Sequence, residues 1–124
     1  KRRQGNDSNA QSLNVIGDVK GRDVLTFDDE IDTGGSILSA VDALKLAGAG
    51  DIYCCVTHPV FSGSSLKKMV DSPIREFVAT DTLPIDVGQC DSKVTILSVA
   101  PLLGEAIHRI HGGLSVGALF EYHG

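Results

Sequence analysis

The stretch Val24-Leu25-Thr26-Phe27-Asp28-Asp29-Glu30-Ile31-Asp32-Thr33-Gly34-Gly35-Ser36 decides the fold of this chain. An apolar segment leads into a group of carboxylates and a Gly-Gly pair, and a helical pattern begins at Ile37. This order predicts a strand, a tight turn and a helix. The first turn of a helix leaves N–H groups without partners and carries partial positive charge, and glycines let an anion approach the main chain. The turn therefore predicts a phosphate site.

The carboxylates in this turn need a separate explanation, because they would repel a phosphate unless they face something else. Three Asp and one Glu fall within residues 28–32, and a sugar diol or a divalent cation is the natural partner for them. Phosphate and diol together predict a phosphorylated ribose as the ligand. The alternative is an ordinary strand-to-helix turn in which Asp32, Thr33 or Ser36 caps the helix.

Composition restricts the classes of protein to consider. A chain of 124 residues is long enough for one domain with a core, and a net charge of −5 offers no basic surface for nonspecific nucleic-acid binding. No apolar run approaches the roughly 18 to 20 residues that span a membrane, and the N-terminus lacks the apolar centre of a signal peptide. We expect a cytoplasmic protein. Cys54, Cys55 and Cys90 are expected to be reduced thiols, because neighbouring strand residues point to opposite faces.

Outside the acidic turn, the pattern alternates between strands and helices. Residues 1–14 are polar and predict a mobile loop. Strands are expected at Val15–Ile16, Val24–Phe27, Ile52–Val56, Ile74–Ala79 and Val94–Leu97, and helices from Ile37 to Gly48, from Ser62 to Val70 and over Val99–Ile110. Thr57-His58-Pro59 is expected to end the third strand. This order predicts an α/β domain with a mainly parallel sheet, in which the acidic turn, Thr57–Gly63 and Asp81–Pro84 meet at the carboxyl ends of the strands.

The acidic turn resembles the ribose-phosphate binding motif of the phosphoribosyltransferase fold, and the chain as a whole resembles the C-terminal part of the ribose-phosphate pyrophosphokinase (PRPP synthetase) family. The motifs that carry the resemblance are Lys1-Arg2-Arg3, Ile16–Val19 with Gly21-Arg22, Thr57–Gly63, Asp81–Pro84, Leu103–Ile107 and Ser115–Phe120. The Thr57–Gly63 motif is much more specific than the acidic turn. Glu30 departs from the family pattern, in which Met is usual at this position.

The resemblance implies a three-layer, type I phosphoribosyltransferase-like domain over residues 15–124, with residues 1–14 as a flexible catalytic loop. It also implies transfer of a diphosphoryl group from ATP to C1 of ribose 5-phosphate, which gives PRPP and AMP and requires Mg²⁺. Lys1 and Arg3 match the catalytic cations, and Arg3 also matches a ribose 5-phosphate ligand. Asp28 and Asp29 match the ligands of the ribose hydroxyls, and the 5-phosphate would be held by Asp32, Thr33, Gly34, Gly35 and Ser36.

Further expectations from the resemblance concern the C-terminal segment, the oligomeric state and the ligands of ATP and Mg²⁺. Ser115 and Phe120 match an allosteric nucleotide site between subunits, or else belong to a C-terminal segment that packs on the domain. The family forms dimers that build hexamers, and its ATP-binding residues and Mg²⁺ ligands lie upstream of Lys1. We therefore expect no metal ligands in this chain, and a fragment that is inactive alone.

Two other protein functions are compatible with the acidic turn, and the role of His58 has two interpretations. A phosphoribosyltransferase that consumes PRPP is one alternative, and a noncatalytic regulatory relative that keeps the pocket is the other. His58 either makes a structural hydrogen bond at the end of a strand, which we favour, or contacts substrate.

Overall fold

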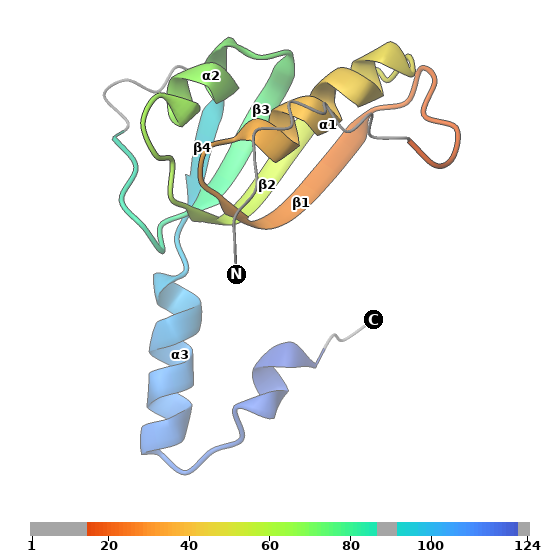
Figure 1. Cartoon of the computed structure of the whole chain (residues 1–124). Coiled ribbons are helices and arrows are strands. Elements are labelled where there is room, and N and C mark those ends of the chain that lie inside the picture. Colours follow the sequence, from red (N-terminus) through yellow and green to blue (C-terminus); the bar gives the residue numbers. More distant parts are fainter. Residues whose placement is uncertain (1–14, 87–91, 122–124) are drawn as a thin grey trace, which may run out of the picture.

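Four parallel strands form a single sheet in the order β1-β2-β3-β4 (Figure 1). The structure, a computed structural model, describes residues 15–86 and 92–121. The elements are β1 (Val24–Ile31), α1 (Gly35–Leu46), β2 (Ile52–Pro59), α2 (Ser65–Asp71), β3 (Ile74–Thr80), β4 (Val94–Leu97), α3 (Ala100–His111) and the short 3-10 helix η2 (Gly117–Phe120). All three strand pairings are parallel, so the predicted α/β class is confirmed.

The core lies between the sheet and the helices α1 and α2. Alternate residues of β2, namely Ile52, Cys54 and Val56, are buried, as strand geometry requires of the face that is covered. The other buried hydrophobic residues come from the neighbouring strands and from the inner faces of the two helices: Ile31, Ile37, Val41, Met69, Ile74, Phe77 and Ala79. This core fixes the strands whose carboxyl ends carry the candidate site.

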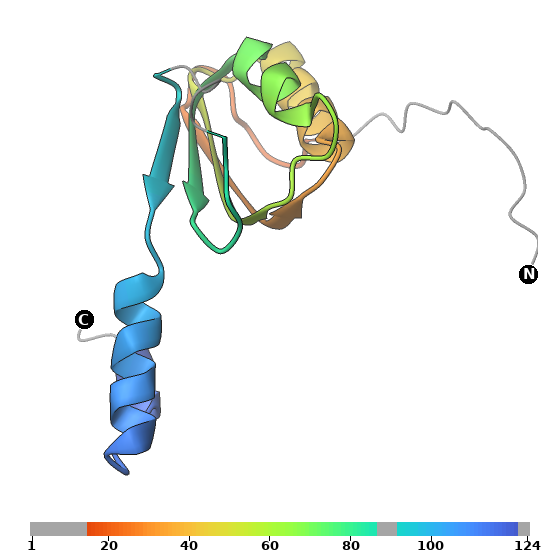
Figure 2. The same ribbon diagram turned by 90° about the vertical axis from the view of Figure 1, so that its left-hand side faces the viewer.

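Helices cover only one face of the sheet within residues 15–86 and 92–121. Figure 2 shows α1 and α2 on the same side, while α3 continues beyond the end of β4 and away from the sheet. On the other face Phe27 is 76% exposed, and α3 has no buried residue. The described residues thus provide two of the three expected layers. No helix among them has the length and apolar character needed to cross a bilayer.

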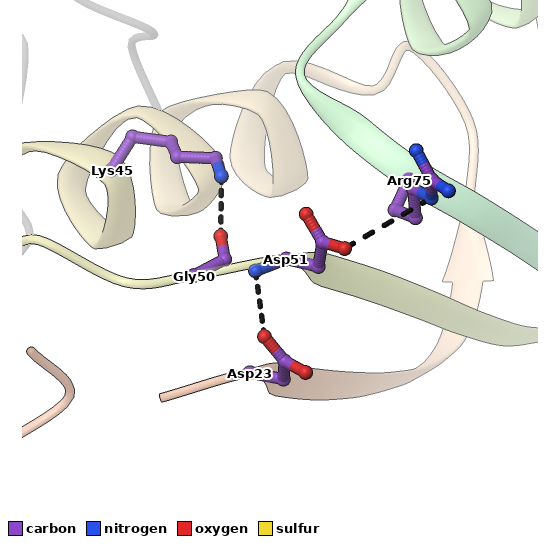
Figure 3. Close-up of polar contacts among 5 residues, drawn as sticks. All are labelled: Asp23, Lys45, Gly50, Asp51 and Arg75. Carbon is purple, nitrogen blue, oxygen red and sulfur yellow. Dashed lines mark hydrogen bonds and ion pairs between the residues drawn. The ribbon is translucent and has the colours of Figure 1, made fainter. Parts of the chain in front are cut away.

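A small set of polar contacts connects neighbouring segments at the edge of the sheet where the strands begin, opposite their carboxyl ends (Figure 3). The Asp51 amide donates to Asp23 Oδ1 at 2.9 Å, and the Lys45 ammonium donates to the Gly50 carbonyl. Arg75 Nε lies 3.9 Å from Asp51 Oδ2, an exposed ion pair of the kind that adds little stability. The bond between Asp51 and Asp23 joins the residues just before β1 and β2, at the end of the sheet remote from the acidic turn.

Several element boundaries differ from those expected. Residues 15 and 16 form no strand, and Ile16 is 99% exposed. β1 runs through the carboxylates to Ile31, and β2 continues through Thr57-His58-Pro59, where a break was predicted. The reason is mutual pairing, because Glu30 is in register with His58 and Ile31 with Pro59.

Two cysteines follow the prediction made for them. Cys54 is buried and Cys55 is partly exposed, and both are free thiols. Burial raises the pKa of the Cys54 thiol, which accepts a hydrogen bond from Thr26 Oγ1 at 3.1 Å. Cys90 lies outside the described residues.

Candidate functional site

A pocket of about 370 Å³ lies where β1 ends and α1 begins. Parallel strands direct their carboxyl ends to one edge, and the turn that follows β1 forms the wall of the pocket there. The lining residues are Asp28, Glu30, Ile31, Asp32, Thr33, Gly34, Gly35, Ser36 and Ile37. The structure therefore brings together every residue expected around the sugar phosphate within residues 15–86, except Asp29, which does not line the pocket.

The N-terminus of α1 is free of protein caps. Gly34, the residue before the helix, adopts φ = 79°, a conformation that side chains rarely tolerate, and no side chain caps the helix. The first turn also contains no acidic residue. The alternative in which Asp32, Thr33 or Ser36 caps the helix is therefore wrong. The first amides of the helix can bind an anion with the help of the helix dipole.

The loop after β2 is attached to this turn by three hydrogen bonds. Phe61 N donates to the Ile31 carbonyl and Ser62 N to the Asp32 carbonyl, both at 3.1 Å. The Ser62 hydroxyl also donates to Asp32 Oδ1. Phe61 makes the connection with φ = 49°, the one positive φ among the described non-glycine residues. The Asp32 carboxylate thus has a hydrogen-bond partner within the protein and helps to hold the loop after β2 against this turn.

A second polar network lies at the carboxyl ends of β2 and β3. His58 Nδ1 is 2.9 Å from Thr82 Oγ1, and the hydroxyls of Thr80 and Thr82 donate to the Thr57 carbonyl at 2.6 and 3.0 Å. The favoured interpretation of His58, a structural hydrogen bond at the end of a strand, is confirmed. Sequence reasoning missed Thr80 and Thr82 as partners, and their only signal was their place in or beside the Asp81–Pro84 motif.

Asp81 connects the same edge to the start of α3. Its Oδ1 accepts a hydrogen bond from the Val99 amide at 2.8 Å. A hydrogen bond from the Ser98 side chain, followed by that from the Val99 amide, lowers the pKa of the Asp81 carboxyl. The predicted convergence of the three motifs is therefore real: the acidic turn, Thr57–Gly63 and Asp81–Pro84 are linked by hydrogen bonds.

The comparisons with known proteins agree with this geometry. The family model of the phosphoribosyl synthetase-associated domain matches residues 6–121. The chain belongs to the phosphoribosyl synthetase-associated domain family. It is 48% identical over 111 residues to a ribose-phosphate pyrophosphokinase of Caldanaerobacter subterraneus subsp. tengcongensis, and 45% identical over 112 residues to one of Oceanobacillus iheyensis. Each alignment covers 90% of this chain but 35% of the relative, so the chain spans about a third of their length.

A solved structure of the same family supports the fold. The crystal structure of phosphoribosylpyrophosphate synthetase from Mycobacterium smegmatis matches with a TM-score of 0.75 and 39% sequence identity. The match covers 79% of this chain and 33% of that protein. The parallel sheet with its flanking helices is therefore the architecture of this phosphoribosyl synthetase-associated chain.

Of the other residues expected at functional sites, two lie outside the described residues and two do not line the pocket. Lys1 and Arg3 lie outside the described residues. Ser115 and Phe120 are exposed on the segment that follows α3, where the Ser115 carbonyl accepts a hydrogen bond from Arg109 at 3.1 Å. Within residues 15–86 and 92–121, no group of three His, Cys, Asp or Glu side chains could hold a metal ion.

Proposed function

We propose that this chain is the ribose 5-phosphate-binding part of a ribose-phosphate diphosphokinase. In this reaction the C1 hydroxyl of ribose 5-phosphate attacks the β-phosphorus of ATP, the bond to the α-phosphate oxygen breaks, and PRPP and AMP are formed. The names of the relatives support the activity. The observation that carries the assignment is the pocket in which the uncapped start of α1 lies beside Asp28.

The 5-phosphate binds at the turn before α1 in this proposal. Backbone amides of Gly35 and Ser36 donate to its oxygens, and Thr33 and Ser36 add hydroxyl donors. Gly34 lets the chain enter the helix without a side chain in the way, and Asp32 holds the turn through Ser62. Hydrogen bonds to a charged group contribute roughly 1.5–3 kcal/mol each, so a few of them give the affinity usual for a metabolite.

The sugar lies toward the strand end, where Asp28 accepts hydrogen bonds from its hydroxyls and Asp29 supports this part of the site. Lys1 and Arg3 are proposed to stabilise the charge that develops on the transferred diphosphoryl group, with residues 1–14 as a closing loop and residues 15–124 as the domain it covers. From the resemblance to the family, we propose that the Mg²⁺ ligands and the ATP site lie mostly outside this chain, and we assign no step of the reaction to the metal.

The remaining proposals concern the whole protein. It acts in the cytoplasm in nucleotide biosynthesis, and dimers assemble into a hexamer. Ser115 and Phe120 contribute to an allosteric nucleotide site between its subunits. The chain alone is inactive, because it spans about a third of its relatives.

An assay on a longer polypeptide that contains this chain separates the three functions. AMP release from MgATP that depends on ribose 5-phosphate supports the diphosphokinase. Consumption of PRPP with free bases, without such AMP release, identifies a phosphoribosyltransferase, and binding without either reaction identifies a regulatory relative. Asp28→Ala is expected to weaken ribose 5-phosphate binding, whereas Lys1→Ala mainly lowers turnover. Unchanged turnover in Lys1→Ala contradicts the proposed role of the loop.

A further inference from the structure

The face of the sheet opposite α1 and α2, called the open face below, is largely apolar. Strand register aligns one side chain from each strand in a row across it: Phe27, Cys55, Val78 and Thr95. Their neighbours along β2 and β3 are buried, so this row points the opposite way. On the same face Leu25 is 53% exposed, Phe27 76% and Leu97 57%. Parallel sheets occur almost only with both faces covered, and within residues 15–86 and 92–121 no helix covers this one (Figure 2).

The helix α3 carries a second apolar surface without a partner, called the α3 stripe below. Leu103, Ile107 and Ile110 are four and three positions apart, so they lie along one side of the helix. They are 57%, 67% and 67% exposed, and no residue of α3 is buried. The opposite side carries Glu105 and Arg109, which form an ion pair at 2.8 Å. A helix with this pattern normally packs its apolar side against a sheet or another helix.

The open face and the α3 stripe are near each other in the sequence but do not meet within the molecule. Two residues, Ser98 and Val99, separate the end of β4 from the start of α3. Figure 2 shows α3 continuing past β4 and away from the sheet. A helix that leaves its own sheet in this way can reach the sheet of a second molecule, and exchange of an element between identical chains is a low-cost route to a dimer.

We infer that two copies of this chain associate, with the α3 stripe of each copy packed on the open face of the other. The inference does not rest on the proposed function, because neither surface lines the acidic pocket. Exchange in both directions covers both open faces and closes with two-fold symmetry. At 1.5 Å per residue α3 is about 18 Å long, and four strands about 4.8 Å apart provide a surface of similar width.

The apolar area is sufficient for a specific interface. Burial of one Leu, Ile or Phe side chain removes on the order of 100 Å² from water. The two surfaces carry six such exposed side chains in each copy, so the dimer buries roughly 1,000 Å² before the smaller side chains between them are counted. Specific interfaces bury about 1,200–2,000 Å² in total. We therefore expect a dimer that dissociates on dilution.

Sedimentation equilibrium of the 124-residue chain tests the association. Phe27→Glu places a charge on the open face, and Ile107→Glu places one on the α3 stripe. Each should weaken self-association at least about tenfold, because a carboxylate buried without a partner is costly. Leu46→Glu is the matched control, since Leu46 is 90% exposed at the end of α1 and belongs to neither surface. Its self-association should equal that of the wild type.

A mixture of the two weakened variants identifies the exchange. In a dimer of Phe27→Glu with Ile107→Glu, one contact contains both charges, and the other joins an unaltered open face to an unaltered α3 stripe. The mixture should therefore associate more tightly than either variant alone. If Phe27→Glu has no effect, the contact does not involve the open face, and if Ile107→Glu has none, it does not involve α3. Either result overturns the inference.

A wild type that stays monomeric at every concentration also overturns the inference, since α3 then covers its own sheet or neither surface is used between copies. Should a variant fold poorly, the wild type decides through Cys55, a partly exposed free thiol in the row on the open face. Its rate of alkylation should fall as the protein concentration rises through the range in which the dimer forms. A rate that does not depend on concentration contradicts the proposed contact.

Discussion

The hydroxyl of Ser62 donates a hydrogen bond to the carboxylate of Asp32, and so joins the loop after β2 to the turn before α1. The two residues are 30 positions apart in the sequence. Their main chains are also joined, because Ser62 N donates to the Asp32 carbonyl at 3.1 Å. Asp32, next to the proposed phosphate site, therefore helps to hold the turn in the form that leaves the start of α1 uncapped.

Ser62→Ala should loosen this turn. Removing the hydroxyl leaves the exposed Asp32 carboxylate without its donor, and we expect a loss of about 1 kcal/mol in the free energy of unfolding and weaker ribose 5-phosphate binding. Urea denaturation and calorimetric titration measure the two effects. Ser64→Ala is the matched control, because Ser64 precedes α2 without capping it by its side chain. Equal effects of the two substitutions contradict the role given to Ser62.

Gly34→Ala should destabilise the protein by about 1–2 kcal/mol, because a side chain at φ = 79° is strained. Steric crowding is not the cause. The atom nearest to a Cβ added at Gly34 would be Met69 Sδ at 3.6 Å, which is an ordinary van der Waals distance. Gly35→Ala provides the control. An added Cβ there would lie 3.9 Å from Thr33 Oγ1, and alanine favours a helix, so stability should be unchanged or higher. Thermal denaturation of both variants checks the contrast, which fails if Gly34→Ala is neutral.

Glu30→Gln should strengthen the binding of ribose 5-phosphate. Glu30 lines the pocket, and its charge opposes that of the phosphate. We expect an increase of about two- to fivefold in affinity at low ionic strength. The gain is modest because the Glu30 carboxylate and the phosphate are near solvent, which screens much of their repulsion. The titration is repeated at high salt, where the wild type and Glu30→Gln should approach the same affinity for ribose 5-phosphate. A gain that does not depend on salt would point to a different cause.

Asp81 should make stability sensitive to acid. Its pKa in the folded protein is lowered from an ordinary value of 3.8, first by the Ser98 side chain and then by the Val99 amide. Because the folded pKa is below the unfolded one, the stabilisation is complete above the unfolded pKa and is lost as the pH falls through the folded pKa. The difference in melting temperature between the wild type and Asp81→Ala should therefore be largest near neutral pH and shrink below pH 3.8.

The variant Ser98→Ala tests the cause of this effect. Because the Ser98 hydrogen bond is the largest cause of the lowered pKa, its removal should reduce the acid sensitivity that Asp81 confers. Melting curves of the wild type and the two variants between neutral and acidic pH provide the comparison. A gap between wild type and Asp81→Ala that is the same at every pH contradicts the assignment.

The order of the residues was enough to predict the α/β class, the parallel sheet and the glycine-containing turn between a strand and a helix. These depend on local properties: the apolar pattern of Ile52–Val56, the helical spacing from Ile37, and a Gly-Gly pair between a strand and a helix. Each is a short-range preference of the chain, so the order of the residues is enough to predict it.

The contacts that join the motifs follow from the folded structure and not from local sequence preferences. Pairing of β1 with β2 extends both strands to Ile31 and Pro59, although carboxylates and a proline would locally favour a turn. The bonds from Ser62 to Asp32 and from His58 to Thr82 connect residues 30 and 24 positions apart. The Asp81 carboxylate likewise accepts a hydrogen bond from the amide of Val99, just before α3, across 18 positions of the sequence. Such partners are chosen by the packing of parallel strands in space, and no spacing along the chain encodes them.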